Sequence, residues 1–442
     1  MPGDGAVVFY DCHEFTGKAR WPYMISDRCW ACRKRGIAWR GRPDAPICSP
    51  NGRNLANHEM QDYDFRMTAE DKATSRSLGF RIRAARDAKG MSQEALRSAL
   101  GIADRQTISA IENGERAVKP EELVRLCSLL EQSLDYFIDP FVVAGEAEFS
   151  WRATDALPDN DLNSFEARAG QWVGLLRFLR RWNASASDPF SFSLRLSPQS
   201  TFEEALTLGE SVAEKLELGS VPAARLTDQI ESVLDIPVLF IDAVESPCGS
   251  VSGATCHLPD LGVILINRNE PEARRNYDLA HELFHAVTWD QMKPDHRDGS
   301  KAGSPKSKSW RIEKLADNFA AGLLMPRAAL DRAIDPRRID EVGHLVDVAD
   351  FLRVSPSALG YRLFNAKLIS QALCDSLRGA TSRLQNQGRP KRFSSAFVEL
   401  LRQGIERGQV SARKVAKSLA MTMPELADLF AEHSTQPAPF AL

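Results

Sequence analysis

The stretch Tyr277–Asp290, YDLAHELFHAVTWD, contains the pattern H-E-x-x-H, with His281 and His285 four residues apart. On a helix this spacing places both imidazoles on one face, one turn apart, so that they can bind a single metal ion. Glu282 points to a different side, where its carboxylate can act on water without binding the ion itself. We expect Asn269 to cap this helix and Pro271 to lie in its first turn. Its apolar residues form one stripe: Tyr277, Ala280, Phe284 and Val287.

A third metal ligand is expected from a second helix further along the chain, because catalytic zinc usually takes three protein ligands. Metzincins continue the motif with Gly and His, where this chain has Thr288 and Gln291, so that class is excluded. In the segment EKLADNFAAGLLMP, Glu313 and Asp317 lie one helical turn apart, opposite an apolar stripe. Glu313 could complete a His, His, Glu set, and Asp317 could bond the second nitrogen of a ligand imidazole.

The composition describes a globular protein with more than one domain. A chain of 442 residues is too long for one core, and we expect two to four domains. A net charge of −3 gives the whole chain no signature of nucleic acid or membrane binding. The sequence lacks a membrane-length apolar run and a signal-peptide pattern, so we expect a cytoplasmic protein without membrane contact.

A second pattern lies upstream, where helical spacing recurs in short segments between Ser77 and Phe137. We expect Ser92 to cap the second helix of this module, Gly101 to form the turn, and Asp104 to cap the third helix. Side chains at these helix starts are of the types that bond base edges and phosphates. The expected DNA contacts are Gln93, Arg105, Gln106, Thr107, Ser109 and Asn113.

These motifs resemble two known families. HELFH followed by E-x-x-A-D-x-F-A-A-x-L-L-M-P resembles the ImmA/IrrE family of zinc metallopeptidases over roughly Thr201–Met325. The resemblance implies one catalytic Zn²⁺ held by His281, His285 and Glu313, with Glu282 as the general base. It also implies that the strand ending in ILIN, residues 264–267, lies beside the substrate. The segments K-G-M-S-Q-E-A-L, L-G-I and T-I-S-A-I-E-N-G-E-R resemble the Cro/XRE helix-turn-helix family, which implies a double-stranded DNA operator, and we expect a homodimer.

Four of the eight cysteines fall within the first fifty residues, in a region that also carries many basic residues. Together they could form a four-thiolate site for a second, structural Zn²⁺. Because only one C-x-x-C pair is present, a disordered basic arm or free thiols are open alternatives. The candidate ligands are Cys12, Cys29, Cys32 and Cys48.

We expect an α+β fold that is mostly α: an all-helical XRE domain, then a zincin-like peptidase domain with a small sheet, then a helical C-terminal region. Strand-like runs occur only after Pro237, at 238–244, 249–258 and 262–269, and the last two predict a hairpin. The predicted units are a cysteine-containing extension (1–72), the XRE domain (75–140), a linker and connecting helix (141–200), the peptidase domain (201–335), a helix-turn-helix-like unit (336–372) and a helical end (373–442).

The combination predicts a DNA-binding regulator with a zinc-dependent endopeptidase domain. Its substrate would be a repressor or antitoxin-like protein, or the chain itself, and cleavage would relieve repression in a stress, mobile-element or phage response. One alternative is a transcription factor whose metallopeptidase-like domain is a sensor or interaction module without proteolysis. Another is an effector peptidase of a defence or toxin–antitoxin system. The histidines could also be satisfied surface residues or bind a structural metal, and the helical module could bind protein instead of DNA.

Overall fold

The computed structural model describes residues 69–104, 106–183, 194, 196–246, 249–298, 307–382, 388–434 and 438–440. The predicted cysteine site lies outside these residues, so Cys12, Cys29, Cys32 and Cys48 receive no structural account. None of the helices within the described ranges has both the length and the apolar character needed to cross a membrane.

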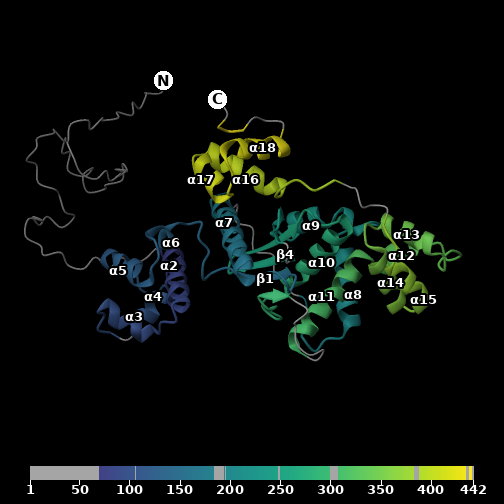
Figure 1. Cartoon of the computed structure of the whole chain (residues 1–442), viewed down its shortest axis with the longest axis horizontal. Coiled ribbons are helices and arrows are strands. Elements are labelled where there is room, and N and C mark those ends of the chain that lie inside the picture. The colour runs from purple at the N-terminus through teal and green to yellow at the C-terminus, as the bar shows by residue number, and fades with distance from the viewer. Residues whose placement is uncertain are drawn as a thin grey trace, which may run out of the picture. The chain divides into compact units, whose positions relative to one another are not determined.

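The upstream module is all-helical, as predicted (Figure 1). Ser92 caps its second helix by accepting a hydrogen bond from the Ala95 amide at 3.1 Å, and Gly101 ends that helix in the left-handed region at φ 68°. Its core contains Ile82, Leu96 and Ile108, all almost fully buried. The helices are α2 (Ala69–Ala88), α3 (Gln93–Leu100), α4 (Thr107–Glu112), α5 (Pro120–Leu130) and α6 (Leu134–Ile138).

A mixed sheet carries the rest of the fold, with strands in the order β2-β5-β4-β1-β6 and with β3 paired to β4. The predicted hairpin is present, since β4 and β5 are antiparallel neighbours. The strands are β1 (Glu148–Ala153), β2 (Val238–Ile241), β3 (Glu245–Ser246), β4 (Gly249–Leu258), β5 (Leu261–Asn267) and β6 (Arg297–Asp298). Helices α7 (Asp159–Asn183), α8 (Phe202–Lys215), α9 (Leu226–Val233), α10 (Glu272–Thr288) and α11 (Lys308–Leu324) surround this sheet, with a 3₁₀ turn at Pro222–Ala224.

The prediction that strands occur only after Pro237 is wrong, because β1 lies in the segment that was expected to be a linker and a helix. Its sequence EFSWRA alternates polar and apolar residues, which is the pattern of a half-buried strand, but six residues were too few to stand out before a long helix. Phe149 and Trp151 enter the core on one face, whereas Glu148 and Arg152 contact the end and the middle of α10 on the other.

Strand β5 lies between β2 and β4, with hydrogen-bonded neighbours on both sides. The backbone of the ILIN segment is therefore already paired on both sides, and the expectation that this strand lies beside the substrate stays a prediction. The inner position arises because β2 joins β5 in parallel, whereas β1 extends the sheet beyond β4.

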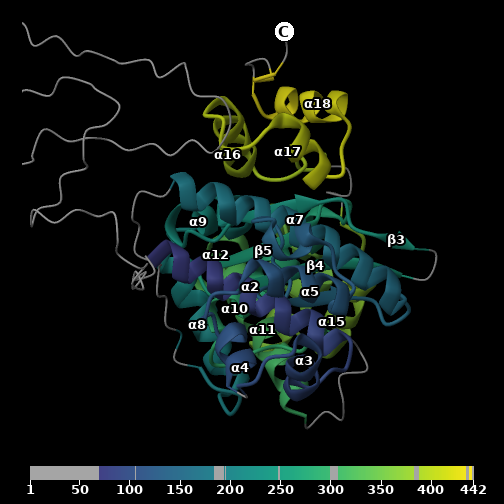
Figure 2. The ribbon, with the colours of Figure 1, turned by 90° about the vertical axis from the view of Figure 1, so that its left-hand side faces the viewer.

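Alternate residues of β5 face two separate cores, so both faces of the sheet are covered. Ile264 and Ile266 pack with α8, α10 and α11, whereas Val263 and Leu265 pack with α7 and the C-terminal helices. Figure 2 shows β4 and β5 between α7 and α10. The remaining helices are α12 (Arg327–Ala333), α13 (Val342–Phe351), α14 (Pro356–Asn365), α15 (Gln371–Arg378), α16 (Ser395–Glu406), α17 (Ala412–Ser418) and α18 (Met423–His433).

Candidate metal centre and DNA-reading helix

Helix α10 carries the H-E-x-x-H motif and begins at Glu272. Pro271 occupies the N-cap position, so the predicted cap by Asn269 is wrong; the Asn269 amide instead donates to the Asn267 side chain at 3.0 Å. Phe284 is fully buried and its ring lies 5.5 Å from that of Phe319 on α11. This aromatic contact fixes the face that α10 presents to α11.

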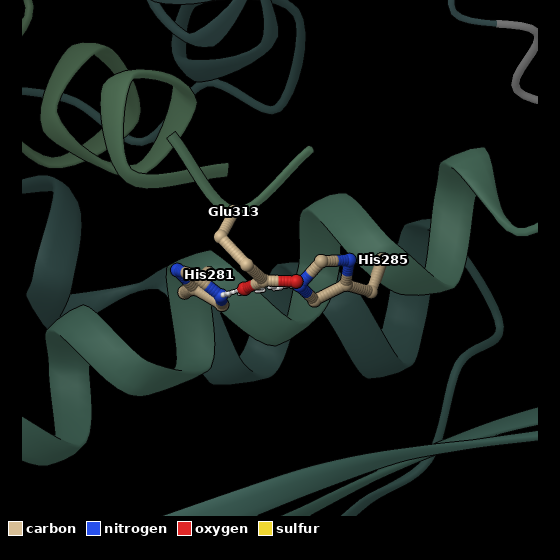
Figure 3. Close-up of side chains that lie close together, drawn as sticks. All are labelled: His281, His285 and Glu313. Atoms are coloured by element: carbon tan, nitrogen blue, oxygen red, sulfur yellow. Dashed lines mark hydrogen bonds and ion pairs between the residues drawn. The ribbon is translucent and has the colours of Figure 1, made fainter. Parts of the chain in front are cut away.

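The three predicted metal ligands converge from these two helices (Figure 3). The Nε2 atoms of His281 and His285 lie 3.1 Å apart, and Glu313 Oε2 lies 3.1 Å from the first and 3.4 Å from the second. Two imidazoles and one carboxylate that converge from adjacent helices are the protein donor set of a catalytic zinc site. The residues present therefore fit the metal that the sequence motif implies.

Backbone contact between α8 and α11 fixes where Glu313 stands. A Cβ atom added to Gly322 would lie 2.1 Å from the Leu206 carbonyl oxygen, and one added to Gly209 would lie 2.2 Å from the Phe319 carbonyl oxygen. Only glycine allows the two helices to approach this closely. The pair therefore holds α11, and with it Glu313, at a fixed distance from its neighbours.

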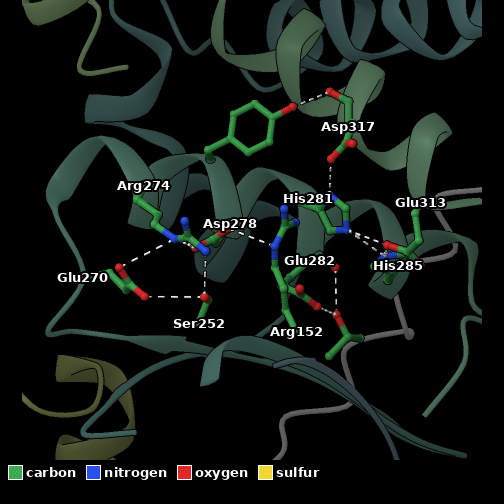
Figure 4. Close-up of polar contacts among 12 residues, drawn as sticks. Arg152, Ser252, Glu270, Arg274, Asp278, His281, Glu282, His285, Glu313 and Asp317 are labelled. Carbon is green, nitrogen blue, oxygen red and sulfur yellow. Dashed lines mark hydrogen bonds and ion pairs between the residues drawn. The ribbon is translucent and has the colours of Figure 1, made fainter. Parts of the chain in front are cut away.

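The Asp317 carboxylate contacts Nδ1 of His281, the ring nitrogen that does not face the other candidate ligands, as predicted (Figure 4). Its Oδ1 lies 3.1 Å from His281 Nδ1, its Oδ2 accepts from Lys314 Nζ at 2.8 Å, and its backbone carbonyl accepts from the Tyr277 hydroxyl at 2.9 Å. A carboxylate at Nδ1 favours the tautomer with its proton there, which leaves the Nε2 lone pair for a metal ion.

The electrostatics of the centre call for a positive charge between the carboxylates. Burial lowers the pKa of His281, but the hydrogen bonds that its ring donates to the Asp317 and Glu313 carboxylates outweigh burial and bring that pKa to about 10. Burial alone would raise the pKa of Glu313, but the two imidazoles hold it well below the usual range. Without a metal a proton on His281 supplies the positive charge, and a divalent cation can replace that proton.

Glu282 lies next to the three converging residues but does not join them. The Thr255 hydroxyl on β4 donates to its Oε2 at 2.8 Å, and a Cβ atom on Gly253 would lie 3.5 Å from its Cγ. Burial raises the pKa of this carboxyl group. No local pattern points to Thr255, because the contact between a strand residue and a helix side chain depends on the tertiary fold.

Arg152 is a further charged residue of this region that sequence reasoning missed, because β1 itself was missed. Its Nε lies 3.3 Å from Asp278 Oδ1 on α10, and Asp278 is almost fully buried. Asp278 also pairs with Arg274, at 3.5 Å between Nε and Oδ2. Figure 4 shows the Arg152 side chain alongside Glu282.

The predicted DNA contacts occupy α3, α4 and the turn between them, and they differ in accessibility. Gln106 and Asn113 are exposed at the two ends of α4, and Ser109 is half-buried between them. Thr107 is buried and its hydroxyl donates to Asp104 at 3.4 Å, so it stabilises the helix start instead of facing outward.

Gln93 and Arg105 are the two remaining predicted contacts. Gln93 donates to the buried carboxylate of Glu112 at 2.8 Å, which orients its side chain. Arg105 lies outside the described residues. Helix α4 begins only at Thr107, so Gln106 occupies its N-cap position, where the sequence predicted a cap by Asp104; Asp104 Oδ1 instead accepts from the Gln106 amide at 3.1 Å.

The fold and the site together define a regulator that joins a DNA-binding helix-turn-helix to a metallopeptidase-like domain. Residues 82–137 match the family model described as helix-turn-helix, of the XRE type, and residues 232–364 match the one described as IrrE N-terminal-like domain. The order of the two matches along the chain confirms the predicted arrangement. Both β1 and Arg152 lie outside either match.

Two solved structures were also compared. The apo form of ComR from S. thermophilus is 13% identical, with 81% of this chain and 95% of that chain covered and a TM-score of 0.14. The apo form of the competence regulator ComR from Streptococcus vestibularis is 11% identical, with 78% and 98% covered and a TM-score of 0.15. TM-scores this low support no conclusion about fold or function. None of the curated proteins matches the chain.

Proposed function

We propose that this protein is a DNA-binding regulator whose second domain is a zinc-dependent endopeptidase. Its substrate is a repressor or antitoxin-like protein, or a second copy of this chain, and cleavage relieves repression. The observation that carries the proposal is the convergence of His281, His285 and Glu313 within 4.8 Å of one another, beside the carboxylate of Glu282.

The proposed mechanism assigns one task to each side chain. Zinc, when bound, would polarise the scissile carbonyl and lower the pKa of water to about 7. Glu282 takes the proton of the attacking water and passes it to the leaving amide nitrogen. Thr255 orients the Glu282 carboxylate through its 2.8 Å hydrogen bond, and Asp317 keeps the His281 ring in position.

The burial of the metal centre favours a second candidate function. His281 and His285 are each 1% exposed, Glu282 is 2% exposed and Glu313 is 8% exposed. A peptide bond cannot reach these groups unless the surrounding structure opens. A regulator whose peptidase-like domain only senses a ligand or partner needs no such opening, and it would use the same metal for stability.

Zinc content tests the metal centre. Purified full-length wild type, Glu282→Gln, His281→Ala and His344→Ala proteins would be compared by elemental analysis. His344 is the matched control, because it is 8% exposed and accepts a hydrogen bond from the Asp335 amide at 3.0 Å, away from the centre. We expect His281→Ala alone to lose one equivalent of zinc. Equal zinc in all four proteins would remove the metal centre from the proposal.

Cleavage is tested by terminal-residue proteomics in cells that produce either wild type or Glu282→Gln protein, with Glu341→Gln as a control at an exposed glutamate. The peptidase proposal predicts new protein termini with wild type and Glu341→Gln, and their loss with Glu282→Gln. The sensor candidate predicts the same termini and the same reporter output in all three. The two outcomes differ even when zinc binding is identical.

We further propose that the protein reads its operator as a homodimer through Gln106, Ser109 and Asn113. Exposed amide groups at the two ends of a short helix, with a half-buried hydroxyl between them, can bond base edges and phosphates. Binding to the DNA upstream of its own coding region should show sequence preference and fall steeply with salt. Binding without sequence preference at any salt concentration would contradict operator reading.

A further inference from the structure

Helices α10, α11 and α14 border a cavity of about 1010 Å³ beside the metal centre. Its lining includes Asp317, which bonds His281, and Arg152, which lies alongside Glu282 (Figure 4). Tyr277 and Asp278, which are consecutive residues of α10, line it as well. The cavity therefore adjoins a residue that orients a metal ligand and a residue that lies next to the proposed general base.

Two exposed cationic side chains stand at the mouth of the cavity. Arg274 and Lys314 stand on opposite helices with side chains 53% and 43% exposed. Both signs of charge occur deeper in the cavity, where the side chains of Asp278, Arg362 and Glu272 are only 2%, 7% and 11% exposed. A molecule that enters from solvent meets the cationic side chains first, and these attract negative charge.

The rest of the lining mixes small apolar side chains with hydroxyl groups, which suits a peptide better than a lipid or a flat apolar ligand. Among the lining residues that the structure describes, Leu206 is the only aliphatic side chain larger than proline. Hydroxyl groups of Ser355, Ser357 and Thr381 border the far wall together with Tyr361, which is 46% exposed. Peptide backbone can bond hydroxyls of this kind along its length, and a tyrosine ring adds contact area at low entropic cost.

We propose that this cavity is the recognition site for the substrate, an extended acidic peptide segment, and that Arg152 at its inner end positions that segment beside Glu282. The inference rests on the proposed peptidase function and names its substrate class. Arg152 suits this task because the Asp278 ion pair holds its side chain in place, and a planar guanidinium matches carboxylate or carbonyl oxygens. Strand β1 thus brings to the site a residue that the matched domain does not contain.

Binding is tested without turnover, in full-length Glu282→Gln protein loaded with zinc. The probes are two pools of fluorescein-labelled decapeptides, one with glutamate and one with lysine at alternate positions, read by anisotropy. We expect the glutamate pool to bind about tenfold more tightly than the lysine pool. Equal affinity for the two pools would overturn the acidic recognition site.

Charge reversal at the cavity mouth locates the binding. Arg274→Glu should weaken binding of the glutamate pool about tenfold. Arg327→Glu is the matched control, because Arg327 is 55% exposed, forms an i,i+4 ion pair as Arg274 does, and lies outside the cavity lining. Equal losses in both variants would mean that the pool binds elsewhere.

Arg152 is tested by a graded pair of substitutions with zinc content as the second readout. Arg152→Gln should lose affinity for the glutamate pool, Arg152→Lys should keep part of it, and both should retain the zinc of the parent. Loss of zinc along with binding would make Arg152 a structural residue and overturn its positioning role. Because no step needs cleavage, a protein without peptidase activity would refute the proposed function while leaving the recognition site measurable.

Discussion

Replacing Asp317 by asparagine perturbs the metal centre at a residue that does not itself bind the ion. Asp317 Oδ1 lies 3.1 Å from His281 Nδ1, and its other oxygen accepts from Lys314 at 2.8 Å. Asparagine keeps the shape and an acceptor oxygen but removes the negative charge. His281 then becomes a weaker ligand, and zinc affinity should fall.

The size of the loss follows from the kind of hydrogen bond. A bond to a charged group contributes about 1.5–3 kcal/mol, against about 0.5–1.5 kcal/mol for a neutral one, so the change removes roughly 1–1.5 kcal/mol. That corresponds to a loss of about tenfold in affinity. The figure lies at the low end of the roughly 10–100-fold range for residues that orient metal ligands, as expected when Lys314 already neutralises part of the charge.

Competition with a chromogenic zinc chelator measures this affinity. The difference in zinc content between the wild type and His281→Ala identifies how much of the bound zinc belongs to this centre. Asp290→Asn serves as the control, because this aspartate lies just beyond α10 and its side chain is 83% exposed. We expect about a tenfold loss for Asp317→Asn and no change for Asp290→Asn. Equal affinities would refute the view that Asp317 orients a ligand imidazole.

Three further predictions concern the scaffold. Gly322→Ala should lower the free energy of unfolding by about 1–3 kcal/mol and weaken zinc binding, because the new Cβ atom would lie 2.1 Å from a backbone oxygen of α8. Gly343→Ala meets open space and should leave the melting temperature unchanged, so equal melting shifts in the two variants would contradict the close contact. Arg177→Ala should lower the free energy of unfolding by about 3–5 kcal/mol in denaturant titrations, because the buried Glu146 carboxylate, 2.7 Å away, loses its partner. Arg181 is half-exposed, so Arg181→Ala should cost under about 1 kcal/mol, and a reversed ranking would be inconsistent with the buried pair. Burial raises the pKa of Glu231, so its ionised form destabilises the fold at high pH. Glu231→Gln should therefore have a higher melting temperature than wild type at pH 8, and the difference should disappear below about pH 4.3. Equal melting temperatures at pH 8 would mean that the carboxylate is solvated.

The two motif helices could be predicted from the sequence because their signals are local. Helical spacing alone places His281 and His285 one turn apart, and it does the same for Glu313 and Asp317. The structure brings the two pairs together through contacts that no local pattern records, above all the glycine contact between α8 and α11. The predicted convergence therefore depended on knowing how such motifs are used, not on the spacing itself.

The parts that could not be predicted are those in which one element meets another far along the chain. Thr255 reaches Glu282 across 27 positions, and Arg152 reaches Asp278 across a still longer separation. Strand β1 carries a period-two pattern, but six residues between helices give too weak a signal to assign a partner strand. Helix starts were also misplaced, since proline at position 271 and the turn at Gln106 shift the caps from the residues expected.

The position of β1 sets a limit on how this protein can be divided for study. A piece trimmed to residues 232–364 would leave one side of β4 with unpaired amides and carbonyls, and it would strip aromatic cover from that end of the sheet. An unpaired strand edge of this kind pairs with the edges of other molecules and leads to aggregation. Expression work aimed at the metallopeptidase-like domain should therefore start no later than Ala147 and keep the C-terminal helices, or soluble yield will suffer for reasons unrelated to zinc.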